Sequence, residues 1–85
     1  MQNTNVIFPV YRKYDHERSI FKIVSAKKFI EIQVMGDLFF YHEINAKILP
    51  DFQLIQDMID MHNGHWVSAN EEEFDVLHSK YLNRK

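Results

Sequence analysis

Apolar residues alternate with polar ones on both sides of the dipeptide Gly36-Asp37, and this pattern constrains the fold more than any other feature of the sequence. Before the dipeptide, the apolar residues at every second position are Ile30, Ile32 and Val34. After it they are Leu38, Phe40, Ile44, Ala46 and Ile48. A period of two is typical of a strand with one face in the core and one in solvent. Residues 29–48 therefore predict two antiparallel strands at the centre of a small sheet.

The register of this hairpin depends on the length of its loop, because a shift of one residue moves every side chain to the opposite face. A two-residue loop at Gly36-Asp37 pairs Val34 with Phe39 and places Leu38 and Phe40 on the other face. A three-residue loop at residues 35–37 pairs Val34 with Leu38 and keeps the apolar residues together. We favour the three-residue loop, in which Gly36 tolerates a positive φ.

Two further strands precede the hairpin, at about residues 6–14 and 19–24. With the hairpin strands at about residues 29–35 and 38–48, they predict a four-stranded antiparallel meander. Pro9 cannot donate a ladder hydrogen bond, so the first strand is expected at a sheet edge or with this position facing outwards.

Four-residue loops fix the other two registers. The first loop pairs Arg12 with Phe21 and Val10 with Ile23, and the second pairs Ile23 with Ile30. These choices agree in placing ten apolar residues on one face: Phe8, Val10, Phe21, Ile23, Ile30, Ile32, Val34, Leu38, Phe40 and Ile44.

A helix is predicted at about residues 50–62, because Pro50 suits the first helical position and Gly64 is placed to end it. Its apolar residues recur at helical spacing and would cover the apolar face of the sheet. Residues 65–67 follow as a possible short fifth strand.

A second helix is predicted at about residues 71–82, with Phe74, Leu77 and Tyr81 as its buried stripe. Asn70 and Glu73 have the spacing of a capping box, and Ser68 with Glu71 also fits, which leaves its start open by two residues. The sequence thus predicts a single α+β domain over residues 1–85, with both helices packed mainly on one face of the sheet.

The opposite, outer face of the predicted sheet has an unusual composition for a solvated surface. By the registers above it carries Tyr11, Lys13, Ile20, Lys22, Val24, Phe29, Met35, Phe39 and Tyr41. The helices could cover part of it, a second subunit could cover it, or it could bind a flat ligand such as unstacked bases.

The composition excludes several classes of function. A formal net charge of −2 and a pI of about 6.2 argue against a strongly basic nucleic-acid binder. The absence of cysteine excludes disulfides and thiolate chemistry and favours a reducing compartment. The polar N-terminus and the lack of a long apolar run predict a cytoplasmic chain without a membrane segment.

No set of residues points to catalysis or to a cofactor. His62 and His65 could bind zinc with Asp60, but the spacing spans a helix end and fixes no third ligand. His42 is expected on the inner face, apart from Glu31 and Glu43, so it lacks a partner for acid–base chemistry. We therefore predict no catalytic residue, no metal and no cofactor.

Three segments, 8–14, 21–23 and 46–50, make the sequence similar to small uncharacterised proteins of Bacteroidetes bacteria. The resemblance extends over nearly the whole chain and implies a bacterial cytoplasmic protein. It implies no activity and no site residue.

These observations lead to a non-enzymatic protein-interaction module that acts through the outer sheet face, with an unidentified protein or a second copy of itself as partner. The alternative is a module that binds single-stranded nucleic acid on an aromatic and basic sheet face. The candidate residues for one or other role are Tyr11, Arg12, Lys13, Lys22, Phe39 and Tyr41.

Overall fold

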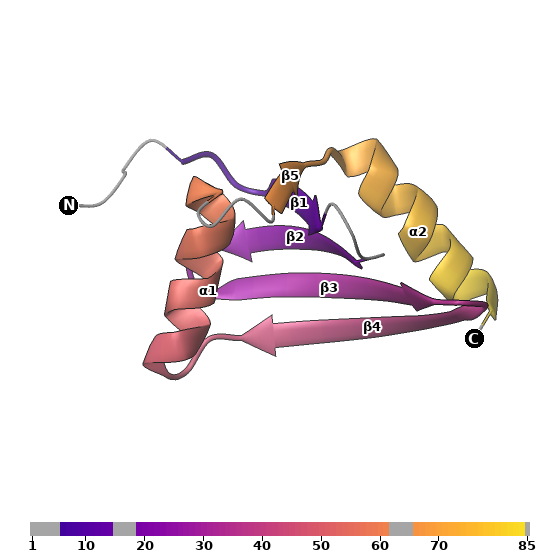
Figure 1. Cartoon of the computed structure of the whole chain (residues 1–85), viewed down its shortest axis with the longest axis horizontal. Coiled ribbons are helices and arrows are strands. Elements are labelled where there is room, and N and C mark those ends of the chain that lie inside the picture. Colours follow the sequence, from indigo (N-terminus) through magenta and orange to yellow (C-terminus); the bar gives the residue numbers. More distant parts are fainter. Residues whose placement is uncertain (1–5, 15–18, 62–65, 85) are drawn as a thin grey trace.

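The computed structural model describes residues 6–14, 19–61 and 66–84, which form one antiparallel sheet and two helices (Figure 1). The strands are β1 (Val10–Tyr14), β2 (Ser19–Ser25), β3 (Lys28–Met35), β4 (Leu38–Asn45) and β5 (Trp66–Ser68). The helices are α1 (Leu49–Asp60) and α2 (Glu71–Arg84). The order of strands in the sheet is β4-β3-β2-β1-β5. The predicted α+β class, the four-stranded meander and the short fifth strand are confirmed.

The first strand is shorter than predicted and lies inside the sheet. Pro9 follows a cis peptide bond and precedes β1, which begins at Val10. The predicted register with β2 is confirmed, since Val10 pairs with Ile23 and Arg12 with Phe21. Of the two alternatives expected from Pro9, the edge position of the strand is wrong, because β5 pairs with the other side of β1 at residues 12–14. Pro9 itself precedes the paired residues.

Both registers of β3 differ by one residue from the prediction. Ile23 pairs with Phe29, and the register shifts between Ile23 and Ser25 so that Ser25 pairs with Lys28 across a two-residue turn. At the next turn Val34 pairs with Phe39, so the three-residue loop is wrong and the two-residue loop is right. Gly36 has a φ of 62° there, the positive value that a two-residue hairpin turn requires.

Because of this one-residue shift, the side chains of β3 face the opposite sides of the sheet from those predicted. Directly opposed residues share a face, so Phe29 lies on the same face as Ile23, whereas Ile32 lies on the other face with Ile20. The predicted single apolar face is therefore wrong. The sheet is apolar on both sides because β3 buries Phe29 on one side and Ile32 on the other.

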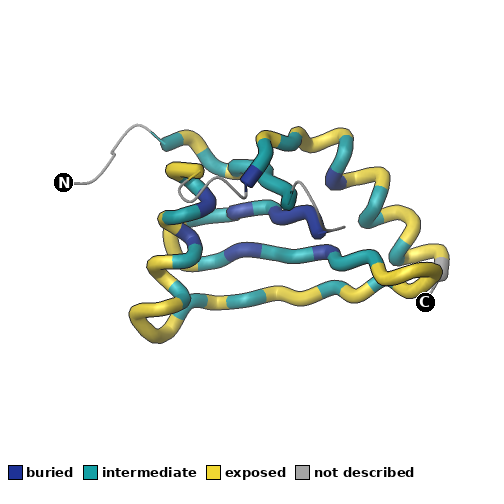
Figure 2. The backbone as a smooth tube through the Cα atoms, viewed as in Figure 1, coloured by how far each residue is buried: buried dark blue, intermediate teal, exposed yellow. Residues whose placement is uncertain are grey.

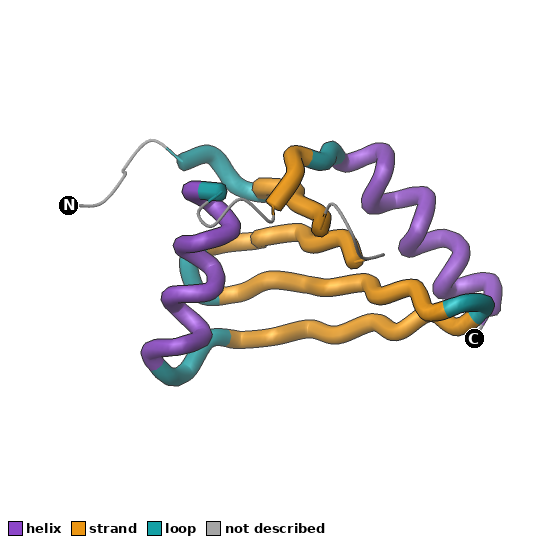
Figure 3. The backbone as a smooth tube through the Cα atoms, viewed as in Figure 1, coloured by secondary structure: helices purple, strands orange, loops and turns teal. Residues whose placement is uncertain are grey.

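Each face has its own helix, which corrects the prediction that both helices pack on one side. We call the two sides of the sheet the α1 face and the α2 face. The buried cluster on the α1 face contains Phe21, Ile23, Phe29, Ile55, Met58 and Trp66. The buried cluster on the α2 face contains Ile20, Ile32 and Phe74. Figure 3 shows that the helices also lie near opposite ends of the strands.

Local signals explain where the helices begin and end. α1 has Pro50 in its first turn. Its C-cap residue is Met61, which has a left-handed φ of 56° and donates its backbone N–H to the carbonyls of Asp57 and Met58. The last helical residue is Asp60, two residues before the predicted end at about residue 62, and Gly64 lies outside the described residues. The capping box of α2 is the one formed by Asn70 and Glu73, since each backbone N–H donates to the other side chain, at 3.2 and 2.8 Å.

Burial is uneven across the sheet. β2 and β3 contain fully buried residues, whereas β4 contains none and alternates between exposed and half-buried residues (Figure 2). In the described parts of the chain, no helix is both long and apolar enough to cross a membrane.

Candidate interaction surfaces

Five of the six candidate residues share one side of the sheet. Tyr11, Lys13 and Lys22 alternate along β1 and β2, and Phe39 and Tyr41 lie on the same side of β4. This grouping agrees with the predicted outer face. The side is the α2 face, however, so the first of the three explanations, cover by a helix, applies to part of it.

The aromatic rings of this face contact α2. Tyr11 lies 5.9 Å from Phe74 between ring centroids, and Tyr41 stacks on both His78 and Tyr81, at 5.2 and 5.3 Å. Lys22 places its ammonium 5.7 Å from the centre of the Phe74 ring, within the range of a cation–π interaction. These side chains therefore hold α2 on the sheet.

Burial at this contact also changes the acidity of the two phenols. Desolvation raises the pKa of Tyr11, and the carboxylates of Glu71 and Asp75 raise it further. Desolvation likewise raises the pKa of Tyr41, with a smaller effect of Glu43. Both hydroxyls thus stay protonated at neutral pH.

Arg12 points to the α1 face and does not join the other candidates. Its Nε donates to the carbonyl of Met58 at 2.8 Å, and a terminal nitrogen donates to the carbonyl of Ile59 at 3.1 Å. These carbonyls belong to the last turn of α1, where a positive charge is favourable and where α1 has no basic residue of its own. Desolvation lowers the pKa of the Arg12 guanidinium. Arg12 therefore caps α1 from the sheet.

Lys13 binds a carboxylate in the first turn of α2. Its Nζ lies 2.6 Å from Oε2 of Glu73, whose other carboxylate oxygen accepts from the N–H of Asn70. The hydrogen bond from Lys13 is the main cause that lowers the pKa of Glu73. One carboxylate thus completes the capping box and ties α2 to β1.

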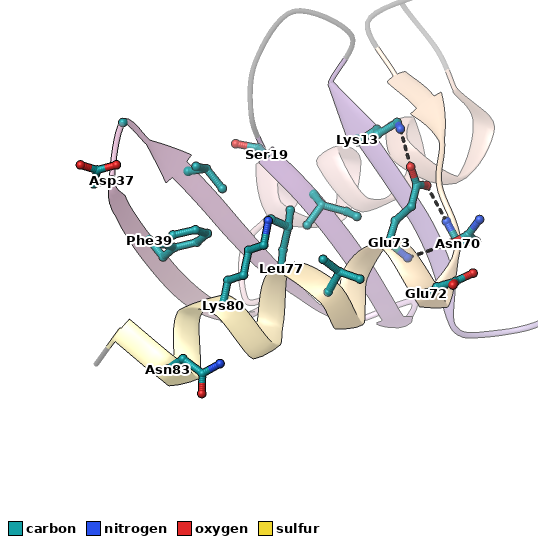
Figure 4. A pocket seen from close by; sticks show the side chains of 14 residues that line it. Lys13, Ser19, Asp37, Phe39, Asn70, Glu72, Glu73, Leu77, Lys80 and Asn83 are labelled. Atoms are coloured by element: carbon teal, nitrogen blue, oxygen red, sulfur yellow. Dashed lines mark hydrogen bonds and ion pairs between the residues drawn. The ribbon is translucent and has the colours of Figure 1, made fainter.

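A groove lies between α2 and the end of the β3–β4 hairpin, on the part of the α2 face that the helix leaves uncovered (Figure 4). Its volume is about 980 Å³, and we call it the α2 groove. The apolar side chains that line it are Ile20, Val34, Phe39, Val76 and Leu77. The polar and charged ones are Lys13, Ser19, Asp37, Asn70, Glu72, Glu73, Lys80 and Asn83.

The sequence identified only part of this groove. Lys13 and Phe39 were candidates, and the spacing of the second helix predicted that Leu77 packs inwards. Val34 was assigned to the other face by the one-residue error in register, and Val76 stands outside the buried stripe of α2. No periodic signal indicates Val76, because its role depends on where α2 crosses the sheet.

The described residues contain no group of three or more histidine, aspartate or glutamate side chains that could hold a metal ion. His62 and His65 lie outside the described residues. His42 pairs directly with Glu31 across β3 and β4, which corrects the expectation that the two lie on different faces. The one-residue shift of β3 brings them opposite each other.

No protein-family model, no curated protein and no solved structure matches the chain.

Proposed function

We propose that the chain is a non-enzymatic protein-interaction module that binds a short apolar segment of a partner protein in the α2 groove. The single observation that carries the proposal is the set of apolar side chains that line this groove. We call them its floor: Ile20, Val34, Phe39, Val76 and Leu77. Val76 remains 49% exposed beside the half-buried Phe39 and Leu77, so an apolar site is open to solvent. Burying such side chains contributes about 25 cal/mol for each Å² removed from water.

The rim of the groove favours a segment with a basic residue at one end. Near the start of α2 the rim carries Glu72 and Glu73, and Lys13 already pairs with Glu73. Glu71 and Asp75 add negative charge on the adjacent surface of the helix. A lysine or arginine beside Glu72 would thus face a negative field, while apolar side chains occupy the floor.

The non-enzymatic part of the proposal is supported by the structural use of the charged groups. Lys13 and Glu73 hold the start of α2, and Arg12 holds the end of α1. Glu31 and His42 form a simple cross-strand pair on the α1 face, away from the α2 groove. General acid–base catalysis needs a positioned acid or base beside a substrate site. The absence of cysteine supports a reducing cytoplasm as the compartment of this module.

The nucleic-acid alternative has less support from the geometry. Single-stranded bases stack on exposed aromatic rings. Tyr11 and Tyr41 instead contact the rings of α2, and the start of that helix is acidic.

The test is a selection of random linear peptides displayed on phage against the whole protein. We expect enriched peptides with at least two apolar residues and one basic residue, whose binding weakens as salt rises. Val76→Glu, which places a charge in the floor of the groove, should weaken these peptides by at least about tenfold, equivalent to 1.4 kcal/mol.

Leu82→Glu is the matched control, because Leu82 lies on the same helix, is 54% exposed and does not line the groove. This variant should bind the peptides like the wild type. Peptides that bind both variants equally well, or a selection that enriches none, would contradict the proposal.

A further inference from the structure

Among the described parts of the chain, β4 forms an open edge of the sheet over its whole length. It has eight residues and pairs with β3 on one side, and no described strand pairs with its other side. In an antiparallel ladder every second residue directs its N–H and C=O away from the neighbouring strand. Natural edges are commonly protected by short strands, lysine or proline. β5 at the other edge has only three residues, but β4 has neither protecting residue type and is long.

Exposed apolar side chains flank both ends of this edge. At the hairpin end, on the part of the α1 face that α1 leaves uncovered, they are Met35, Leu38 and Phe40, with 56%, 61% and 38% of their surface exposed. At the other end, where β4 leads into α1, they are Ile48, Leu49 and Phe52, with 61%, 67% and 38% exposed. Figure 1 shows that the start of α1 lies beside the end of β4.

The two ends also carry opposite charges. Asp37 lies in the turn before β4, and Lys47 follows β4, and both are exposed. Within β4 itself, Glu43 is already paired with Lys28 of β3, at 3.6 Å. The edge therefore has a carboxylate at its hairpin end and a lysine at its α1 end, where the carboxylate of Asp51 accepts from the backbone N–H of Lys47 at 3.1 Å.

We propose that β4 pairs antiparallel with β4 of a second copy of this chain, so that the two sheets become one continuous sheet. An antiparallel pair around a two-fold axis brings the hairpin end of each copy against the α1 end of the other. Leu38 and Phe40 of one copy then lie near Ile48 and Phe52 of the other, and Asp37 approaches Lys47. A parallel pair would instead bring like charges together, so the charge pattern selects the antiparallel arrangement.

Opposing Asp37 to Lys47 also opposes His42 to His42 of the other copy, so the axis of this dimer passes beside His42, near the centre of β4. This register keeps the α1 faces of both copies on the same side, which is where Met35, Leu38, Phe40 and the helix α1 lie. The interface is thus made of backbone hydrogen bonds in the middle and two equivalent apolar contacts at the ends. Of the side chains named in this interface, Asp37 also lines the α2 groove.

The first measurement is the mass in solution by light scattering over a range of protein concentrations. We expect twice the chain mass of 10.3 kDa at high concentration. Leu38→Lys should raise the dissociation constant by at least about tenfold, since it places a charge in each apolar contact. Leu82→Lys, at a residue of similar exposure on α2, should leave it unchanged.

The second measurement locates the contact. The chain has no cysteine, so a single introduced thiol can form a disulfide only between two copies. His42→Cys lies beside the axis, where the Cα atoms of opposed residues are about 4.5–5.5 Å apart, within the range that a disulfide spans. Gln53→Cys, on the exposed side of α1, is the control.

Rapid cross-linking of His42→Cys with little cross-linking of Gln53→Cys would support the pairing. A chain that remains monomeric at every concentration overturns it. A dimer that tolerates Leu38→Lys, or that does not cross-link through His42→Cys, also overturns it, because the contact would then lie elsewhere.

Discussion

Two neighbouring residues of β1 hold the two helices. Arg12 points to the α1 face and caps the last turn of α1, while Lys13 points to the α2 face and binds Glu73 at the start of α2. Because successive residues of a strand face opposite sides, adjacent positions can serve different helices. The sequence marked both residues as parts of a binding surface. Their observed partners are elements of the fold itself.

Arg12→Lys tests the cap on α1. A lysine ammonium cannot reproduce the planar set of donors that reaches two carbonyls at once, so we expect a loss of about 1–3 kcal/mol in the free energy of unfolding. Urea denaturation measures this loss. Lys27→Ala, in an exposed turn, should change the same quantity by less than about 0.5 kcal/mol. Equal stability of Arg12→Lys and the wild type would show that the cap contributes nothing.

Glu73→Gln tests the ion pair at α2, since glutamine keeps the capping oxygen but removes the charge. The pKa of Glu73 is lower in the folded chain than its ordinary value of 4.5, so its contribution is complete above that value. The contribution is lost as the pH falls through the lower, folded pKa. Both side chains are more than a third exposed, so solvent screening limits the pair to at most about 1 kcal/mol.

We therefore expect Glu73→Gln to be slightly less stable than the wild type at pH 7 and equally stable near pH 2. Urea denaturation at the two pH values compares them. A difference that is the same at both would assign the effect to the cap and not to the charge.

At the scale of the elements, β3 determines how the sheet is covered. The strand positions, both helices and the first register were predictable, because alternation and capping residues act locally. The side of the sheet that each side chain of β3 faces was not predictable from such local signals. Both neighbouring turns allow two loop lengths, and Phe29, Ile30, Ile32 and Val34 offer apolar residues to either face. The α2 groove depended on that choice, so it could not be located from the sequence.

Phe74→Leu tests whether the two faces of the sheet form one cooperative unit. Phe74 is buried on the α2 face, whereas Trp66 is buried on the α1 face. The smaller side chain should cost about 1–3 kcal/mol. We expect thermal unfolding followed by Trp66 fluorescence to shift by the same amount as unfolding followed by far-ultraviolet circular dichroism. A shift seen only in circular dichroism would mean that α2 unfolds separately.

At the scale of the whole molecule, the two helices cover opposite faces at opposite ends of the strands (Figure 3). Each face of the sheet is thus covered by a helix at one end and exposed at the other. The α2 groove occupies the open part of one face, and the apolar residues beside the β4 turn occupy the open part of the other. The two proposed contacts therefore lie mainly on different sides of one sheet, and both include Asp37 in the turn before β4.

The position of α2 after all the strands also affects how the protein is made. Synthesis proceeds from the N-terminus, so β1–β4 and α1 leave the ribosome before α2 does. Until α2 emerges, Ile20 and Ile32 lack the helix that buries them, and Tyr41 lacks its stacking partners. The nascent chain thus exposes a second apolar sheet face beside the open edge of β4, and emergence of the fourteen-residue helix α2 ends that exposure.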